Sequence, residues 1–427
     1  MNATRLGYRF DTSFTIKGLL SNTPRLWLKN KRDADDLNGL WRIHDNIYDF
    51  TNFIQWHPGG QFWLEATKGT DITESFEIHH LKTNRSERLL KHFLIKPAPN
   101  PRLSPFTFAD DGFYKTLKRN VEKTLNNVVE NDITFFDTQS DVLLIITIIL
   151  SMFSVIHYNV SYGFAAGLFA ALTVTFNHSY VHKRDNLRMY YSDLLLIPSS
   201  DLRVSHIFNH HVFANNIIDM TGLICLFLTN LFLDKRSKAI SLILGALFFW
   251  PMVIHVLIIL KIVVAFMSKN IVFNADILLS CILPTLMLYL GSGAPQLSFI
   301  MYNFIIAVES FFLCLIIYTN RDIHCETNSD PLIFKESNDW GIYQLNMICK
   351  GDQKLDWTVA VGNCVLHYLF PTLDGSVFRH LYPVMNETLS QFNINVQFKS
   401  QESGFLRFLK QQWRNSQVLG NKNLKSD

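Results

Sequence analysis

Long apolar runs in the second part of the chain limit the folds that it can adopt. The runs 142–157 and 162–176 are joined by a short turn, and the runs 275–290 and 297–318 are joined by a glycine-containing turn. A helix needs about 17 to 25 residues to cross a bilayer, so each pair predicts a membrane hairpin. The composition agrees, because 48% hydrophobic and 18% charged residues are unusual for a soluble protein.

A fifth apolar run, 239–264, bears on the number of membrane crossings. If this run crossed alone, the residues after 318 would face the opposite side from those after 177. Both regions carry histidines that we assign to one site below. For both regions to face the same side, the number of crossings between them must be even. This favours a helix at 239–264 that is embedded without crossing, or a partner crossing made by residues 222–233. We favour four crossings.

Residues 1–139 are mixed and polar, and they predict a soluble head in front of the membrane body. The head contains the sequence His57-Pro58-Gly59-Gly60, and His80 follows further along the chain. Glycines beside His57 let the backbone approach a ligand closely. Two imidazoles on opposite walls of an apolar slot would fill both axial positions of a haem iron, which leaves one-electron transfer as its chemistry. The residues expected to line the slot are Trp56, Phe62, Trp63, Leu64 and Phe76.

These residues resemble the cytochrome b5 family. The resemblance rests on the HPGG sequence, the following G-T-D-x-T-E-x-F stretch, and a histidine four positions after that phenylalanine. It implies that the head binds haem b with His57 and His80 as axial ligands. His79 is the competing assignment for the second ligand.

Two clusters of histidines follow the first predicted hairpin. His178 and His182 lie four positions apart, which places them on one helical face. His206 and His210 repeat this spacing, with His211 beside them. Such pairs suit two ligands of one metal ion. Asp219 follows the second cluster, where a carboxylate would orient an imidazole.

The clusters resemble the first two histidine boxes of the membrane fatty-acid desaturase and hydroxylase family, H-x3-H and H-x3-H-H. The continuation RDNLRMYY and the upstream head narrow the resemblance to fusions of cytochrome b5 with a desaturase, and the whole chain resembles the cytochrome b5-related proteins of insects. The resemblance implies a cytosol-facing site of non-haem iron that receives electrons from the haem and removes hydrogen from an acyl chain.

The same resemblance implies where the protein is located and which partners it has. We expect an integral, multi-pass protein of the endoplasmic reticulum, with the haem head and the histidine boxes facing the cytosol. The expected partners are a membrane lipid or acyl chain and a flavoprotein reductase that reduces the haem. No nucleic acid is expected, because the formal net charge is only +3.

The third histidine box departs from the family pattern. The chain reads GNCVLHYLFPTLDG, and alignment on LFPTLD puts Cys364 and Tyr368 in two histidine positions and leaves only His367. The segment 318–328, where relatives often carry further histidines, holds only His324. The remaining candidate ligands could hold one metal ion well, but not two in the manner of the family. They are His178, His182, His206, His210, His211 and His367.

Two functions follow from this departure. In the favoured one, the body is a degenerate desaturase fold that binds lipid or one metal ion, anchors the chain and accepts electrons without desaturation. In the alternative, the body is an active iron-dependent acyl-chain desaturase or hydroxylase in which His324, His380 or a water completes a site of two irons.

The predicted fold is an α+β cytochrome b5 head followed by an all-α multi-pass membrane desaturase-like domain. Its predicted parts are an N-terminal lead-in at 1–35, the haem-binding domain at 36–98, a linker and amphipathic helix at 99–139, the membrane domain at 140–400, and a basic tail at 401–427.

Overall fold

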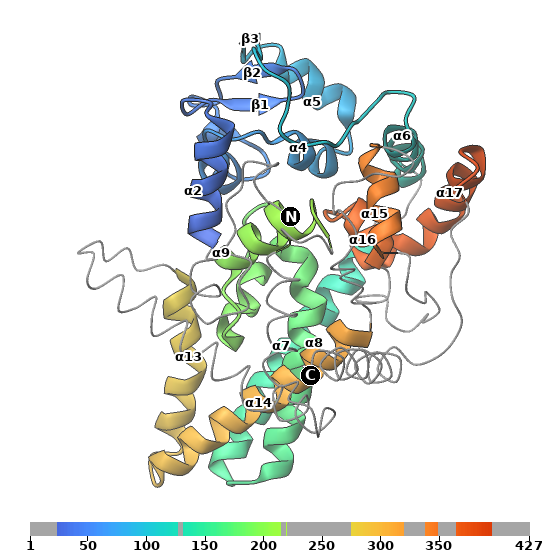
Figure 1. Cartoon of the computed structure of the whole chain (residues 1–427). Helices are drawn as coiled ribbons and strands as arrows, with labels where there is room; N and C mark the ends of the chain where they lie inside the picture. Colours follow the sequence, from blue (N-terminus) through green and yellow to red (C-terminus); the bar gives the residue numbers. More distant parts are fainter. Residues whose placement is uncertain are drawn as a thin grey trace, which may run out of the picture.

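The computed structural model describes residues 24–126, 131–214, 219, 275–319, 338–348 and 364–394. Over this part of the chain, a head with a small sheet lies at one end and long apolar helices lie at the other (Figure 1). A layer of short helical segments lies between them. The apolar run 239–264, His324 and the basic tail at 401–427 lie outside the described residues.

The head is built on an antiparallel sheet in the order β1-β2-β3, formed by β1 (Trp41–Ile43), β2 (Asn46–Tyr48) and β3 (Leu94–Pro97). Trp41 pairs with Tyr48, and the register between β2 and β3 shifts once, at Ile47 and Tyr48. The segments between β2 and β3 are η2 (Ile54–Trp56), α3 (Gln61–Thr67), α4 (Thr73–His79) and α5 (Thr83–Leu90). The buried core of the head comprises Trp41, Ile43, Tyr48, Phe50, Leu64 and Phe76.

Helix α2 (Pro24–Asp35) precedes the sheet and is fastened to the head by Arg32. The Arg32 guanidinium donates to the carbonyl of Ala66 at 2.7 Å and to that of Lys68 at 2.9 Å. Trp27 on the same helix is buried in the core of the middle layer. Helix α2 therefore joins the head to the rest of the protein.

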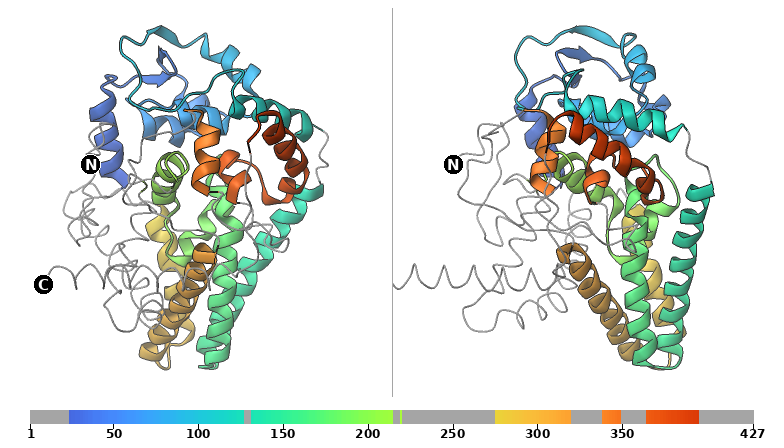
Figure 2. Two further views of the ribbon diagram at one scale, coloured as in Figure 1. Left: turned by 45° about the vertical axis from the view of Figure 1, so that its right-hand side comes forward. Right: turned by 90° about the vertical axis from the view of Figure 1, so that its right-hand side faces the viewer.

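The amphipathic helix predicted within 99–139 is α6 (Phe113–Leu125). It packs against α15 (Trp340–Ile348) and α17 (Phe378–Gln391), which belong to the body (Figure 2). Its inward face is fully covered, since Phe113, Tyr114 and Leu117 are buried. This helix therefore lies against protein and also contacts the head through lysines that we describe below.

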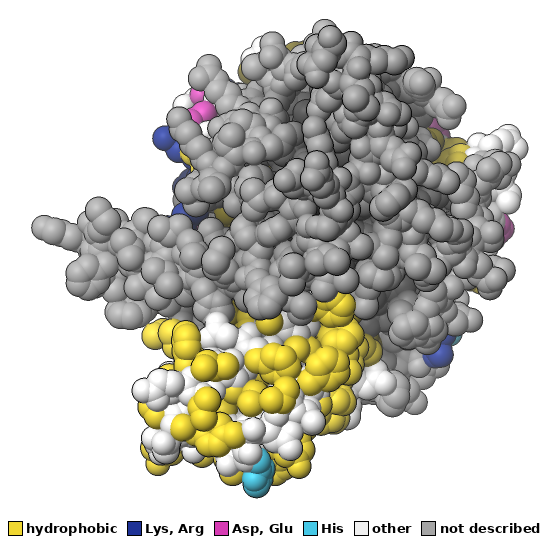
Figure 3. All heavy atoms as spheres, turned by 60° about the horizontal axis from the view of Figure 1, so that its bottom comes forward, with side chains coloured by type: hydrophobic (Ala, Val, Ile, Leu, Met, Phe, Trp, Pro, Cys, Tyr) yellow, Lys and Arg dark blue, Asp and Glu magenta, His cyan; other side chains and the backbone are white. Residues whose placement is uncertain are grey.

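Both predicted helical hairpins are present in the structure. The first is α7 (Asn131–Ile156) with α8 (Val160–Val181), and the second is α13 (Ala275–Leu290) with α14 (Pro295–Thr319). Among the described residues, three helical segments are long and apolar enough to cross a membrane: Phe136–Ile156, Val160–Val181 and Pro295–Leu313. Figure 3 shows hydrophobic side chains gathered over this end of the molecule. The favoured number of four crossings stays a prediction.

Helices α8 and α14 approach each other closely at a glycine. A methyl group on Gly167 would lie 2.6 Å from Cβ of Val308 and 2.7 Å from the carbonyl oxygen of Ile305. Small residues at such crossings allow tight van der Waals packing, which stabilises helix pairs where lipid removes the hydrophobic driving force. The close approach fixes the position of α8 against α14, and α8 carries the first histidines at its end.

The middle layer carries the short segments that bear the remaining histidines. Segments η5 (Arg203–His210), α16 (Cys364–Leu369) and η7 (Gly375–Val377) share a buried core with α2, α6, α15 and α17, so this part of the layer is held from several sides. The predicted fold class is confirmed: a head with a small sheet precedes a mostly helical region with candidate membrane-spanning helices. The other short segments, η3 (Arg188–Tyr191), η4 (Asp193–Leu195) and α9 (Ser199–Leu202), bear no histidine.

Candidate functional site

His57 and His80 face each other across a cavity in the head. His57 follows η2 and His80 ends α4, and the centroids of their imidazole rings are 6.1 Å apart. An ion bound by one nitrogen of each ring, at about 2 Å from each, would hold the two ring centroids roughly 6 Å apart. The spacing therefore fits an iron between the two rings.

Backbone carbonyls orient both rings. Nδ1 of His57 lies 2.8 Å from the carbonyl oxygen of Gly60, and Nδ1 of His80 lies 2.9 Å from that of Phe76. Because a carbonyl only accepts, Nδ1 carries the proton in each ring and Nε2 keeps its lone pair. This is how a protein fixes the tautomer of a metal-binding histidine.

The two glycines after His57 are required by the geometry of this turn. A methyl group on Gly59 would lie 2.9 Å from Cε1 of His57, so no larger residue fits without moving the ring. Gly60 has a φ of +104°, which residues with a side chain rarely adopt. The sequence Pro58-Gly59-Gly60 thus brings the backbone close to the first candidate ligand.

The cavity that both rings line has a volume of about 540 Å³, within the ~300 to 1,000 Å³ of typical cofactor and ligand sites. Of the predicted slot residues, Trp63, Leu64 and Phe76 line it. The prediction for Trp56 is wrong, since its side chain is 76% exposed, and Phe62 packs under Arg203 instead. Further apolar lining comes from Phe50, Phe53, Ile72, Leu90 and Phe93.

His79, the competing ligand, also lines the cavity but lies differently. Its ring packs against Trp63 with 5.8 Å between centroids, and its Nδ1 bonds to the carbonyl oxygen of Ser75 at 2.8 Å. Burial lowers the pKa of both His79 and His80 to about 4, so both rings are neutral. Only His80 is paired with His57 across the cavity.

A second site gathers five histidines from the body. His178 lies on α8, His182 directly follows it, His206 and His211 come from η5 and its end, and His367 lies on α16. One nitrogen of each ring lies within 4.8 Å of the others. Nε2 of His178 is 3.4 Å from that of His182, and Nε2 of His206 is 2.9 Å from that of His211.

The spread of these nitrogens matches one metal ion. Donors on opposite sides of an ion, each about 2.1 Å away, lie roughly 4.2 Å apart. Two ions separated by about 3.5 to 4 Å would need donors spread much more widely. Burial, and then the neighbouring histidines, hold the pKa of His182 and His211 well below the usual value, and burial does the same for His206 and His367. Neutral imidazoles are the form that binds metal.

His210, the sixth predicted ligand, lies outside this cluster. Segment η5 is a π-helix, and its bond from the His211 amide to the His206 carbonyl spans five residues at 2.9 Å. This wider winding pairs His206 with His211, whereas α-helical spacing predicted His210. Nδ1 of His210 bonds instead to the Asp219 carboxylate at 2.6 Å, and its Nε2 bonds to the Tyr368 hydroxyl. Both ring nitrogens of His210 are therefore engaged by protein groups.

Of the other residues predicted to complete the site, only His380 is described with its side chain, and it is not part of the cluster. His380 is exposed on α17, and its Nε2 lies 3.1 Å from Nε of Arg379. His324 and the side chain of Cys364 lie outside the described part of the chain. Asp219, predicted to orient an imidazole, does so for His210.

The cavity lined by His57 and His80, called the haem cavity from here on, shares a wall with the histidine cluster. The sequence did not indicate this contact. His182 belongs to the cluster and also lines the cavity, together with Lys183, Arg184, Phe208 and Thr372 of the body. Phe208 packs edge-on against Trp63 of the head, with 5.5 Å between centroids. No motif signals this contact, because it depends on how the head docks on the body.

The docking of the head rests first on Arg203. Its guanidinium lies over the rings of Trp63 at 4.8 Å and Phe62 at 5.0 Å, and it pairs with Asp185 at 2.5 Å. Gly60 packs on the same Asp185. These contacts hold the turn that carries His57 against the body.

A second set of docking contacts surrounds Glu77 of α4. Its buried carboxylate is 2.8 Å from Nζ of Lys115, 2.9 Å from Nζ of Lys118 and 2.7 Å from Nε2 of His44. Lys118 also donates to the Glu77 carbonyl at 2.7 Å. Burial alone would raise the pKa of Glu77, but these partners outweigh it and lower that pKa well below its usual value.

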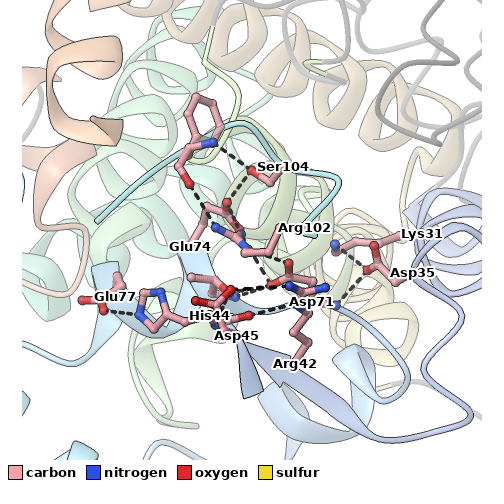
Figure 4. Close-up of polar contacts among 12 residues, drawn as sticks. Lys31, Asp35, Arg42, His44, Asp45, Asp71, Glu74, Glu77, Arg102 and Ser104 are labelled. Atoms are coloured by element: carbon pink, nitrogen blue, oxygen red, sulfur yellow. Dashed lines mark hydrogen bonds and ion pairs between the residues drawn. The ribbon is translucent and has the colours of Figure 1, made fainter. Parts of the chain in front are cut away.

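The linker after the head is tied down in the same region (Figure 4). Arg102 pairs with Asp71 at 2.7 Å and with Glu74 at 2.5 Å, and Ser104 donates to Glu74 at 2.6 Å. The two carboxylates hold the pKa of Arg102 above its usual value despite burial. Linker, head and α6 therefore form one connected set of polar contacts.

Comparison with known proteins gives matches to the head and to most of the chain. The family model of the cytochrome b5-like haem/steroid binding domain matches residues 27–97. The chain is 33% identical to the cytochrome b5-related protein of Drosophila melanogaster over 390 residues, which cover 87% of each chain. It is 25% identical to acyl-lipid (8-3)-desaturase B of Dictyostelium discoideum over 195 residues, 42% of each chain. No solved structure matches.

Proposed function

The chain belongs to the family of the cytochrome b5-related protein of Drosophila melanogaster, and we propose that it transfers single electrons from haem b in its head to a metal ion in its membrane body. The likeness to acyl-lipid desaturases supports a role in lipid metabolism. The observation that carries the proposal is the shared wall, because His182 both lines the haem cavity and belongs to the five-histidine cluster.

The residues of the head would hold haem b between His57 and His80. Their Nδ1 protons are engaged by backbone carbonyls, so both Nε2 atoms are oriented for the iron. With both axial positions filled, haem b supplies one-electron transfer and no substrate binding. The apolar lining from Phe53, Phe76 and Phe93 would keep water away from a bound haem.

The five-histidine cluster would hold one non-haem iron. Neutral, buried imidazoles suit such an ion, and their spread of 4.8 Å supports a single ion. Docking by Arg203 and Glu77 keeps the donor cavity fixed beside the cluster. Covalent fusion raises the effective concentration of the electron donor at its acceptor, so no diffusional encounter is needed.

The arrangement around His210 disfavours a desaturase with two irons. A second ion would need His210, whose two ring nitrogens are already bonded to Asp219 and Tyr368. An oxygen-activating pair of metals needs enough donors for both ions with positions left open. We therefore propose that the body anchors the chain, binds lipid or an acyl chain and accepts electrons without desaturation.

An active acyl-chain desaturase or hydroxylase remains the second candidate. It is favoured by the similarity to the probable Delta(5) fatty acid desaturase C of Dictyostelium discoideum, 26% identical over 143 residues, which cover 33% of this chain and 31% of that protein. It requires that His210 leave Tyr368 and that His324 or a water complete a second iron site.

The location of the protein and its reductase are part of the proposal. Three apolar helices support insertion in a membrane. We infer that the membrane is that of the endoplasmic reticulum, that the head and the histidine cluster face the cytosol, and that a flavoprotein reductase reduces the haem there.

Reoxidation of the haem tests the transfer. The full chain is purified in detergent with haem, loaded with ferric iron, reduced at the haem with one electron without oxygen, and followed by absorbance. We expect rapid reoxidation that needs the iron and is lost in His211→Ala, whereas the exposed His380→Ala matches the parent. Equal reoxidation with and without iron would refute the proposal.

A further inference from the structure

In the described part of the chain, every charged residue that lines the haem cavity is cationic. They are Arg85 of α5 in the head, and Lys183 and Arg184 from the segment after α8 in the body. Among the residues that the structure describes, the lining contains no aspartate or glutamate, and most of the rest of it is apolar. A cavity of this kind complements a ligand that is largely apolar but carries negative charge at one edge.

The three cations are not equivalent. Nζ of Lys183 pairs with Asp374 at 2.5 Å and lies 4.7 Å above the ring of Tyr180, so its charge is largely satisfied within the body. Arg85 and Arg184 have exposed side chains, and neither forms an ion pair with any residue that the structure describes. These two guanidinium groups are available to a ligand in the cavity, one from each side of the docking interface.

Haem b has the matching charge, because its apolar ring carries two propionate groups at one edge. We propose that Arg184 of the body and Arg85 of the head bind the haem propionates, so that haem is held jointly by the head and the body. The proposal rests on haem binding by His57 and His80. A guanidinium suits the task because its fork of donors matches a carboxylate.

Joint binding has two measurable consequences. Loss of the Arg184 contact speeds the release of haem, although both axial ligands remain. It also lowers the reduction potential, because a positive charge near the ring disfavours the ferric state, which carries one more positive charge than the ferrous state. Greater exposure of the haem to water would also lower the potential, so the ester experiment below separates the propionate contact from a purely structural role.

The first experiment compares Arg184→Gln with the matched control Arg119→Gln in the full chain in detergent. Arg119 is exposed on α6 and bonds only to the hydroxyl of Thr116 among the contacts described. Transfer of haem to excess apomyoglobin measures release. We expect roughly tenfold faster release from Arg184→Gln, the loss typical of one charge-assisted contact, with a lower potential and an unchanged absorption spectrum. Arg119→Gln should match the parent.

A second experiment separates the propionates from other effects of the substitution. The parent and Arg184→Gln are loaded with the dimethyl ester of haem, which has no carboxylates. We expect the two proteins to release this haem equally fast. If Arg184→Gln releases natural haem at the rate of the parent, or if the difference persists with the ester, the proposal is wrong. Absence of a six-coordinate haem spectrum in the parent would instead refute the haem ligation itself.

Discussion

Lys118 offers a sharp test of how the head is docked on helix α6, which itself packs against the body. Its ammonium donates to the Glu77 carboxylate at 2.9 Å and to the Glu77 carbonyl at 2.7 Å, and both residues are buried. In Lys118→Met the Glu77 carbonyl loses its cationic donor, and the Glu77 carboxylate keeps only Lys115 and His44 as partners. Breaking one partner of a buried ion pair costs about 3 to 5 kcal/mol. Because two partners remain, we expect about 3 kcal/mol.

Hydrogen exchange measures this cost directly. The amides of α4 exchange when the head opens, and a loss of about 3 kcal/mol corresponds to more than 100-fold faster exchange. Lys123→Met is the matched control, because Lys123 is exposed on the same helix α6. If Lys118→Met changed the exchange of α4 by less than about tenfold, or no more than Lys123→Met, the contribution assigned to this contact would be refuted.

Three further predictions concern the same regions. The pKa of Glu77 is lowered on folding, so its contribution to stability is complete above the ordinary value of 4.5 and is lost as the pH falls below it. The protection of the α4 amides, relative to their intrinsic exchange rates at each pH, should therefore fall on acidification, and this fall should be weaker in Glu77→Gln. His80→Ala should abolish the six-coordinate haem spectrum and His79→Ala should keep it; the reverse would assign His79 as the ligand. Cys364→His with Tyr368→His should raise the iron bound per chain, and unchanged iron content would show that the third box is wrongly aligned.

The part of the haem cavity that the head supplies was predictable because its residues are close in sequence. The turn at Gly59 and Gly60 and the spacing to His80 follow from local geometry, and the structure places these residues around one cavity. The helical hairpins were predictable for the same reason, since their apolar runs and turns are continuous in the chain.

The arrangement of His210 could not be predicted from its spacing. A residue four positions after His206 shares its face in an α-helix, but η5 is wound as a π-helix and pairs His206 with His211. That winding depends on packing against distant segments, including the bond from His210 to Tyr368. The shared wall at His182 and the contact between Lys118 and Glu77 were missed for the same physical reason, because both depend on docking of the head.

The metal content of the purified full chain tests the central claim most directly. Haem is measured by its absorbance and total iron by mass spectrometry, after the protein is loaded with ferrous iron without oxygen and freed of excess. The five-histidine cluster predicts one haem and one non-haem iron per chain, with the non-haem iron lost in His211→Ala. Two non-haem irons per chain would contradict the account and favour an active desaturase or hydroxylase.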